Sequence, residues 1–273
     1  MKTALKTTAF AALLLTPLAI GPAAAQPAPY NEVGATWGHW HIISKDVEAN
    51  KKLFIAMGGK LYMPGGQPLM MFPHLYINLT LGDEKGDGGT QGSVVNHVGF
   101  IVNNVQERVA QWKAAGVKVL PGNNNRLDQA YVETPDGVRM EILEDKTQAM
   151  PIRHEHVHLS LPEGEIPKAQ AWYAKTFGGK ATTRNNQPVV DVPGAQIRFA
   201  KADKPQARTL GRVLDHIGFD VKDLKAFIAK IEGEGIKLDE PYRESPSGNA
   251  ITYITDAWGT RIELIKRGPI PAL

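Results

Sequence analysis

A unit of about 60 residues is repeated four times along this chain of 273 residues, and this repeat restricts the fold more than any other feature of the sequence. Each copy opens with a segment in which apolar and polar residues roughly alternate, as they do in a half-buried strand. The four segments are Gly38–Ile43, Asn96–Ile101, Glu155–Ser160 and Asp215–Asp220. Each carries a histidine near its start: His39, His97, His156 and His216.

Every one of these strands is followed by a segment whose apolar residues fall on one helical face. The predicted helices are Val47–Met57, Val105–Ala115, Ile166–Phe177 and Leu224–Glu234. Each ends at a glycine, which readily adopts the left-handed conformation that closes a helix; these glycines are Gly58, Gly116, Gly178 and Gly235. The interval from strand histidine to glycine is 19, 19, 22 and 19 residues (58−39, 116−97, 178−156, 235−216), so the register is kept in all four copies.

Short β-rich stretches with turn signals complete each copy and predict hairpins. They are Leu69–Leu81, Gln129–Leu143, Val189–Ala200 and Ala250–Ile265. The chain is therefore predicted to be an α+β protein of four βαβββ modules. Modules two and four resemble each other most, which indicates that one pair of modules was duplicated. We expect modules one and two to form a domain over residues 34–147 and modules three and four a second domain over residues 152–268, because the intervals within each half are short.

The N-terminus predicts a signal peptide over residues 1–25. Lys2 and Lys6 precede a mostly apolar run from Ala9 to Ile20, and Ala23–Gln26 offers a small-residue cleavage site. The run is too short for a comfortable membrane span, and no later stretch is apolar enough for one. Cleavage after Ala25 would leave 248 residues (273 − 25) in the periplasm or outside the cell.

Composition narrows the chemistry further. The chain has no cysteine, which fits an oxidising compartment and excludes thiolate ligands and thiol nucleophiles. Any metal site must therefore use histidine and carboxylates. The formal charge of +3 includes the two signal-peptide lysines, and the remaining basic residues are scattered, which argues against nucleic acid as a partner.

Two sets of metal-ligand type follow from the repeat. Within the first half the set is His39, His97 and Glu141, and within the second half it is His156, His216 and Glu263. The intervals agree closely, at 58 and 44 residues in one set (97−39, 141−97) and 60 and 47 in the other (216−156, 263−216). Two histidines and one carboxylate bind Fe²⁺, Mn²⁺ or Zn²⁺ while leaving positions open for substrate or oxygen. The alternative is a metal-free pocket that retains these inherited positions.

On these residues the chain resembles the vicinal-oxygen-chelate superfamily, which includes glyoxalase I, bleomycin-resistance proteins, fosfomycin-resistance enzymes and extradiol dioxygenases. The resemblance covers Gly38 to Lys266. It implies that paired modules form cupped, incomplete β-barrels. It also implies that first-strand histidines and last-strand glutamates hold a divalent metal against adjacent oxygens of the ligand.

The sequence departs from the glyoxalase pattern at the fourth ligand. Where the family has a last-strand glutamate in the odd modules, this chain has Asn78 and Arg198. The remaining three-ligand pattern is closest to extradiol dioxygenases, and Tyr131 and Tyr253 match a tyrosine that those enzymes place near substrate. An aromatic residue would also fill a barrel at these positions. The accessory histidines that those enzymes use for acid–base work have no evident counterpart.

His74 is a further candidate for a general base or ligand, because it is predicted to share a strand face with Tyr76 and Asn78. We therefore slightly favour the first set, since Arg198 near a metal would add charge repulsion in the second.

The leading hypothesis is an exported metalloenzyme that acts on a small, oxygen-chelating organic substrate and is nearest to ring-cleaving dioxygenases. Lyase, isomerase and hydrolase activities are alternatives that the sequence does not exclude. It also allows a homodimer. The competing hypothesis is a metal-free protein that sequesters a small ligand, as bleomycin-resistance proteins do. In that case Trp37 and Trp40, together with Met63, Met70 and Met71, would line an adaptable pocket.

Overall fold

A computed structural model describes residues 27–82, 88–246 and 248–269 of the chain. The predicted signal peptide, residues 1–25, lies outside the described residues. None of the helices in the described ranges is long and apolar enough to cross a membrane.

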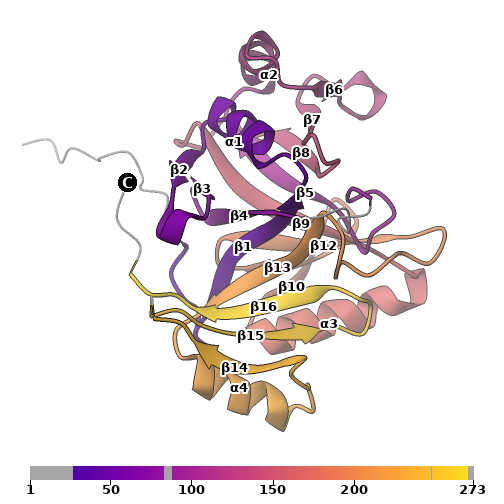
Figure 1. Ribbon diagram of the computed structural model, residues 1–273. Coiled ribbons are helices and arrows are strands. Elements are labelled where there is room, and N and C mark those ends of the chain that lie inside the picture. Colours follow the sequence, from indigo (N-terminus) through magenta and orange to yellow (C-terminus); the bar gives the residue numbers. More distant parts are fainter. Residues whose placement is uncertain (1–26, 83–87, 247, 270–273) are drawn as a thin grey trace, which may run out of the picture.

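The described chain consists of four βαβββ modules, as predicted (Figure 1). Module one comprises β1 Ala35–Ser44, α1 Val47–Ala56, β2 Lys60–Tyr62, β3 Leu69–Phe72 and β4 Leu75–Leu81. Module two comprises β5 Val95–Val102, α2 Val105–Ala114, β6 Val119–Pro121, β7 Gln129–Glu133 and β8 Arg139–Glu144. Module three comprises β9 Ile152–Leu161, α3 Ile166–Phe177, β10 Lys180–Arg184, β11 Gln187–Val192 and β12 Ala195–Lys201. Module four comprises β13 Leu214–Val221, α4 Leu224–Gly233, β14 Glu240–Glu244, β15 Ala250–Thr255 and β16 Arg261–Lys266. Short 3₁₀ turns occur at Pro64–Gly66, Asn123–Asn125 and Glu163–Glu165.

Local sequence accounts for the helix ends. Three helices have an N-cap residue whose side chain accepts a hydrogen bond from a backbone N–H of the first turn. These N-cap residues are Asp46, Asn104 and Asp223. The predicted glycines follow the helices with positive φ, at 103° for Gly58, 81° for Gly116, 62° for Gly178 and 83° for Gly235. The predicted helix bounds are confirmed to within one residue at each end.

The strands form two sheets of eight, and their order corrects the predicted pairing of modules. One sheet runs β14-β15-β16-β13-β1-β4-β3-β2 and the other β10-β11-β12-β9-β5-β8-β7-β6. Module one thus pairs with module four, through antiparallel β1 and β13, and module two pairs with module three, through antiparallel β5 and β9. The pairing expected within each half of the chain is wrong. Modules two and three are joined by the seven-residue connection 145–151, which places them side by side.

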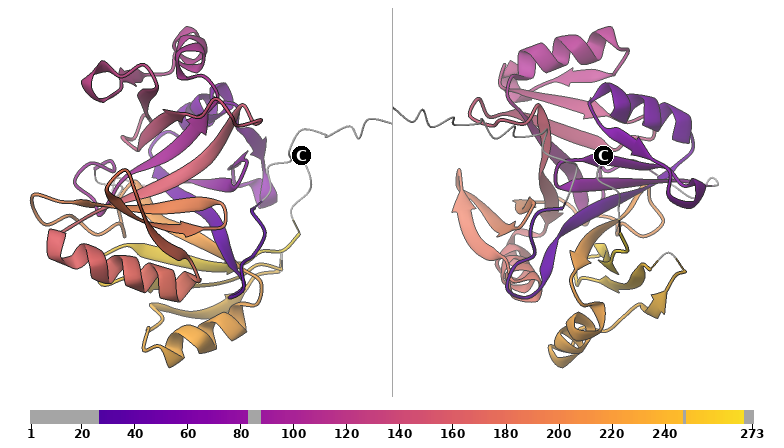
Figure 2. Two further views of the ribbon diagram at one scale, coloured as in Figure 1. Left: turned by 180° about the vertical axis from the view of Figure 1, so that it is seen from behind. Right: turned by 90° about the vertical axis from the view of Figure 1, so that its left-hand side faces the viewer.

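The helices lie at the two ends of the molecule, α1 and α2 together at one end and α3 and α4 at the other (Figure 2). A hydrogen bond from Lys230 Nζ of α4 to the carbonyl oxygen of Thr176 in α3 joins the second pair at 2.9 Å. The two modules of each half thus place their helices at the same end of the molecule, whereas each sheet is shared between the halves.

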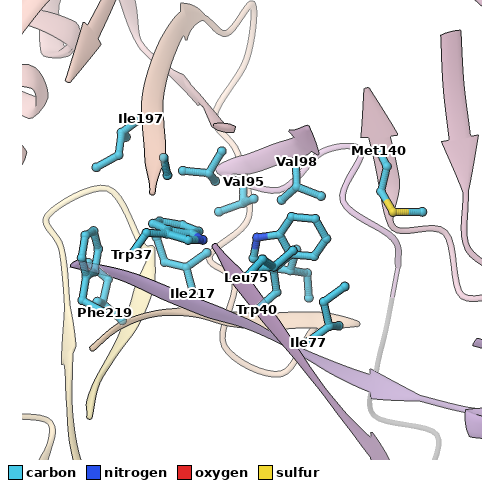
Figure 3. Packing of buried hydrophobic residues seen from close by; sticks show 14 of the residues in the cluster. Trp37, Trp40, Leu75, Ile77, Val95, Val98, Met140, Ile197, Ile217 and Phe219 are labelled. Atoms are coloured by element: carbon cyan, nitrogen blue, oxygen red, sulfur yellow. The ribbon is translucent and has the colours of Figure 1, made fainter. Parts of the chain in front are cut away.

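One hydrophobic core links the two sheets. Trp37 and Trp40 of β1 are fully buried and lie close to Val98 of β5 and Ile197 of β12, which belong to the other sheet (Figure 3). The face of β1 that carries the tryptophans thus packs into the core between the sheets. The opposite face of each sheet is available for polar side chains.

Candidate metal centres

Irregularities in the central strands decide which residues face away from the core. The register between β1 and β13 shifts between Trp37 and His39. These two residues would share a face of a regular strand, but because of the shift Trp37 faces the core and His39 faces away from it. An equivalent shift between β5 and β9 separates His154 from His156. His154 consequently stacks on Trp37 in the core, with ring centroids 5.1 Å apart.

The first centre consists of His39 on β1, His216 on β13 and Glu263 on β16. Glu263 Oε2 lies 3.0 Å from His216 Nε2 and 3.5 Å from His39 Nε2. All three residues are buried.

The second centre consists of His97 on β5, His156 on β9 and Glu141 on β8. Glu141 Oε2 lies 3.4 Å from His97 Nε2 and 3.2 Å from His156 Nε2. A further imidazole approaches this centre, since His158 Nδ1 lies 3.0 Å from His97 Nε2. The two centres use equivalent strand positions of the two sheets.

The structure brings all six predicted ligand candidates into such groups, but it exchanges the odd-module histidines between them. The predicted sets His39–His97–Glu141 and His156–His216–Glu263 are wrong, because β1 and β5 belong to different sheets. His39 instead faces the histidine and glutamate of module four, and His156 faces those of module two.

Two glycines that sequence reasoning missed make room for the odd-module imidazoles. A Cβ at Gly218 would lie 2.6 Å from His39 Nε2, and a Cβ at Gly99 would lie 2.6 Å from His156 Nε2. Both glycines occur in the sequence His-x-Gly-Phe, and the recurrence of this motif in modules two and four is the signal that could have identified them. The second position after an even-module histidine must therefore lack a side chain, because the partner strand's imidazole occupies that space.

Both centres have the donor set and spacing that a divalent cation requires. Ligand atoms each about 2.1 Å from a common cation are separated by roughly 3.0–3.4 Å at octahedral or tetrahedral angles. The carboxylate-to-imidazole distances in the two centres span 3.0 to 3.5 Å. In addition, the buried His39 Nε2 and His156 Nε2 atoms have no hydrogen-bond partner among the described residues. These residues therefore fit a bound metal ion.

Three of the four histidines are oriented by the residue immediately before them. The Nδ1 atoms of His97, His156 and His216 lie next to oxygens of Asn96, Glu155 and Asp215, at 2.9, 2.5 and 2.6 Å respectively. Hydrogen bonds of this kind fix the ring orientation of metal-binding histidines. His39 differs, because Gly38 precedes it and its Nδ1 lies 2.8 Å from Arg267 Nη2.

The predicted tyrosines lie beside the two carboxylates. Tyr253 donates its hydroxyl to Glu263 Oε2 at 2.8 Å, and Tyr131 approaches Glu141 Oε1 at 3.4 Å. Gln129, which sequence reasoning did not single out, also hydrogen-bonds to Glu141 Oε1. Burial opposes ionisation of both glutamates, but the neighbouring histidines outweigh it and lower the pKa of each carboxyl.

His74 does not belong to either centre. It lies in the turn between β3 and β4, with φ at 64°, rather than in the strand with Tyr76 and Asn78. The prediction that it shares their strand face is wrong, because the hairpin turn ends the two-residue alternation before β4 begins.

Asn78 and Arg198, at the positions where the resemblance implies a fourth ligand, differ in their surroundings. Asn78 pairs with His41 across β4 and β1 and lines a cavity next to the first centre. Arg198 instead forms a salt bridge to Glu155 Oε1 at 2.5 Å, while the other oxygen of Glu155 binds His156. The charge of Arg198 is thus balanced beside the second centre.

A cavity of about 380 Å³ opens at the first centre. It is lined by Glu263, Tyr253, His41 and Asn78, together with Arg243, Glu244, Ser245, Asn249, Ile251, Ile265 and Arg267. A second cavity, of about 420 Å³, lies between α1 and residues 115–118 and 133–135 and is lined by none of the histidines. Of these two cavities, only the one at the first centre is lined by candidate metal ligands.

The cavity is not lined by the tryptophans and methionines that were expected there. Trp37, Trp40, Met70 and Met71 are buried, and Met63 is exposed. The expectation of an adaptable Trp and Met pocket is wrong, because the β1 irregularity turns both tryptophans into the core between the sheets.

Comparison with known proteins agrees with this geometry. Residues 156–264 match the Glyoxalase/Bleomycin resistance protein/Dioxygenase superfamily. This match covers the second half of the chain and supports its membership of the superfamily. A protein of Arabidopsis thaliana named as a chloroplastic lactoylglutathione lyase is 28% identical over 137 residues. That match covers 48% of this chain and 37% of the Arabidopsis protein, well under two thirds of its length.

Solved structures share the fold of this chain over most of its length. Glyoxalase I from Zea mays is 15% identical, with a TM-score of 0.64 over 85% of this chain and 92% of the maize chain. A proposed dioxygenase from Bacillus subtilis is also 15% identical, with a TM-score of 0.62 over 89% of this chain and 87% of the other. At these identities the likeness shows the fold alone.

Proposed function

We propose that this protein is an exported, divalent-metal-dependent enzyme that acts on a small organic substrate with two adjacent oxygens. Ring-opening dioxygenation is the reaction class nearest to its ligand set. The observation that carries the proposal is the position of the first centre, whose Glu263 and Tyr253 form part of the wall of the cavity. A two-histidine, one-carboxylate set with space beside it is typical of non-haem Fe²⁺ oxygenases, and it also accommodates Mn²⁺ or Zn²⁺.

His39, His216 and Glu263 would hold the metal, which when bound supplies a Lewis acid next to substrate oxygens. The Tyr253 hydroxyl fixes the orientation of the Glu263 carboxylate through the 2.8 Å hydrogen bond. Asn78 lines the same cavity and offers an amide to substrate or water.

His41 contributes a neutral imidazole to the cavity wall. Burial and the neighbouring histidines lower the pKa of His41 to about 3, so this ring is uncharged at neutral pH. Its Nε2 lies 2.7 Å from Thr80 Oγ1, which holds the ring in place. The guanidinium groups of Arg243 and Arg267 line the same cavity, and they favour a substrate whose oxygens carry negative charge.

The proposal is tested first by the metal content of the purified chain and of the His216→Ala and His97→Ala variants. The wild-type protein should bind two equivalents of Fe²⁺, Mn²⁺ or Zn²⁺ at saturation, and each variant should bind one. His74→Asn is the matched control, because His74 lies outside both centres and asparagine tolerates its positive φ. Two bound equivalents that survive both alanine substitutions would contradict the site assignment.

Activity is tested after anaerobic reconstitution with Fe²⁺, with catechols and hydroxy-ketones offered in the presence and absence of oxygen. Turnover should disappear in His216→Ala and persist in His97→Ala, because the cavity lies at the first centre. A wild-type protein that binds ligands but no metal would instead be a sequestration protein. Export is tested by the N-terminus of the protein recovered from the periplasm, which should begin at Gln26.

A further inference from the structure

The two centres differ in the hydrogen bond that reaches Nδ1 of the odd-module histidine. At the second centre, a carboxylate oxygen of Glu155 lies 2.5 Å from His156 Nδ1. At the first centre, a guanidinium nitrogen of Arg267 lies 2.8 Å from His39 Nδ1. A carboxylate accepts a hydrogen bond here, whereas a guanidinium has five N–H donors and no acceptor.

This difference determines which imidazole nitrogen carries the proton. His156 donates Nδ1–H to Glu155, so in the neutral ring the lone pair of its Nε2 faces the position of the cation. His39 must accept at Nδ1 from Arg267, so in the neutral ring the proton resides on Nε2, the atom that faces Glu263 and His216. His216 resembles His156, since Asp215 Oδ1 lies 2.6 Å from its Nδ1.

The Arg267 contact is built into the fold. Arg267 Nε donates to Asp220 Oδ2 at 2.7 Å, and both side chains are largely or fully buried. The guanidinium also lies over the Tyr76 ring, 4.8 Å from its centroid. Gly38 keeps this arrangement possible, because a Cβ there would lie 3.0 Å from the Asp220 backbone nitrogen and closer still to its side chain.

The His97 side of the second centre has no comparable constraint. His158 Nδ1 lies 3.0 Å from His97 Nε2, and Gln187 Nε2 lies 2.8 Å from His158 Nε2. A glutamine amide can present either a donor or an acceptor by rotating, so His158 can release the lone pair of His97 or offer its own nitrogen to the cation. Arg267 has no such alternative.

We infer that Arg267 is a positioning residue that holds His39 in the tautomer opposed to metal binding, and that the second centre therefore binds a divalent cation more tightly than the first. The inference rests on the proposed function, because it concerns the metal of the same two centres. Loading of the first centre requires His39 to move its proton to Nδ1, which breaks the hydrogen bond from Arg267. Outer hydrogen-bond partners of metal-binding histidines change affinity by roughly 10–100-fold.

The tautomer is measured on the metal-free protein by ¹⁵N NMR of the imidazole rings, assigned with a His39→Ala variant. His39 should show a protonated Nε2, and His156 and His216 should carry a proton on Nδ1. A His39 ring with a protonated Nδ1 and an unprotonated Nε2 would overturn the inference whether or not metal binds.

The affinity difference is measured by titration with Co²⁺ or Zn²⁺. Two classes of site are expected, with the tighter one lost in His156→Ala and the weaker one lost in His216→Ala. The double substitution Asp220→Asn with Arg267→Gln removes one charge of each sign, so net charge is kept, and the amide oxygen at position 267 can accept from His39. This variant should raise the affinity of the first centre about 10–100-fold. Asp191→Asn with Arg184→Gln is the matched control, because it removes one charge of each sign from an exposed salt bridge in the other sheet.

Equal affinities in the wild type, or an unchanged first centre in the double variant, would overturn the inference alone. Binding at neither centre would overturn the proposed function, and the affinity difference with it. Thermal unfolding of each variant shows whether it folds, and the tautomer measurement on the wild type does not depend on any destabilised variant.

Discussion

The glycines opposite the odd-module histidines give the most demanding test of the two centres. Gly218→Ala should remove metal from the first centre only, and Gly99→Ala from the second only. Neither glycine is a ligand candidate, and each lies on a strand that belongs to a different module from the histidine it contacts. The effect depends entirely on the strand pairing seen in the structure.

Its size follows from the space available. A Cβ at either position would lie 2.6 Å from the Nε2 atom of the opposing histidine, whereas non-bonded atoms pack at about 3.5 Å or more. The imidazole must therefore move by at least about 0.9 Å, which exceeds the roughly 0.2 Å tolerance of a metal–ligand bond. His39 and His156 are fully buried, so overpacking should also lower the free energy of unfolding by about 1–3 kcal/mol.

The measurements are metal stoichiometry by elemental analysis after dialysis, and unfolding by urea. Each single variant should bind one equivalent fewer than the wild type, and the double variant should bind none. Gly233→Ala is the control, because a Cβ at this helical position meets nothing within 4 Å, and both centres should survive. Retention of metal at the first centre in Gly218→Ala, or its loss from the second, would contradict the strand pairing on which this prediction depends.

Three further predictions test other parts of the structure. Burial lowers the pKa of His154 to about 3 from 6.5, so the stability that its neutral ring provides above pH ~6.5 is lost as pH falls towards 3. Between pH 7 and 4.5 this loss of the free energy of unfolding is about 2–3 kcal/mol. In urea unfolding of the metal-free protein, the stability of His154→Gln should therefore fall less with pH than that of the wild type. An equal fall in both proteins would contradict the prediction. Tyr253→Phe should weaken metal binding at the first centre about 10-fold. Tyr131→Phe should weaken metal binding at the second centre less, because the Tyr131 hydroxyl lies 3.4 Å from the Glu141 carboxylate. Metal titrations that show equal effects of the two substitutions would contradict this difference. Trp40→Ala should cost about 3–5 kcal/mol in urea unfolding, and a loss under about 1 kcal/mol would be incompatible with its place between the sheets.

Much of the fold follows from local sequence. The helix periods, the capping residues Asp46, Asn104 and Asp223, and the closing glycines act over a few residues, and they set the helix bounds to within one position. The repeat also identifies the residue types at the centres, because the first-strand position carries histidine in all four modules and the last-strand position carries glutamate in modules two and four.

The assembly of the modules could not be read in the same way. Successive strand histidines are separated by 58, 59 and 60 residues (97−39, 156−97, 216−156), so spacing does not distinguish a partner within a half from a partner across the halves. Only the antiparallel pairing of β1 with β13 and of β5 with β9 decides which imidazoles share a glutamate. The irregularities in these strands then decide that the tryptophans face the core and that His39 and His156 face the glutamates of the centres.

The sequence by itself determined the module, its number of copies and the six side chains that meet at the centres. The tertiary structure alone decided how these side chains are grouped and which side chain meets Nδ1 of His39, since Arg267 reaches this ring across 228 residues of chain. Local propensities act between neighbours along the backbone, whereas strand pairing and burial bring together residues that no local rule connects.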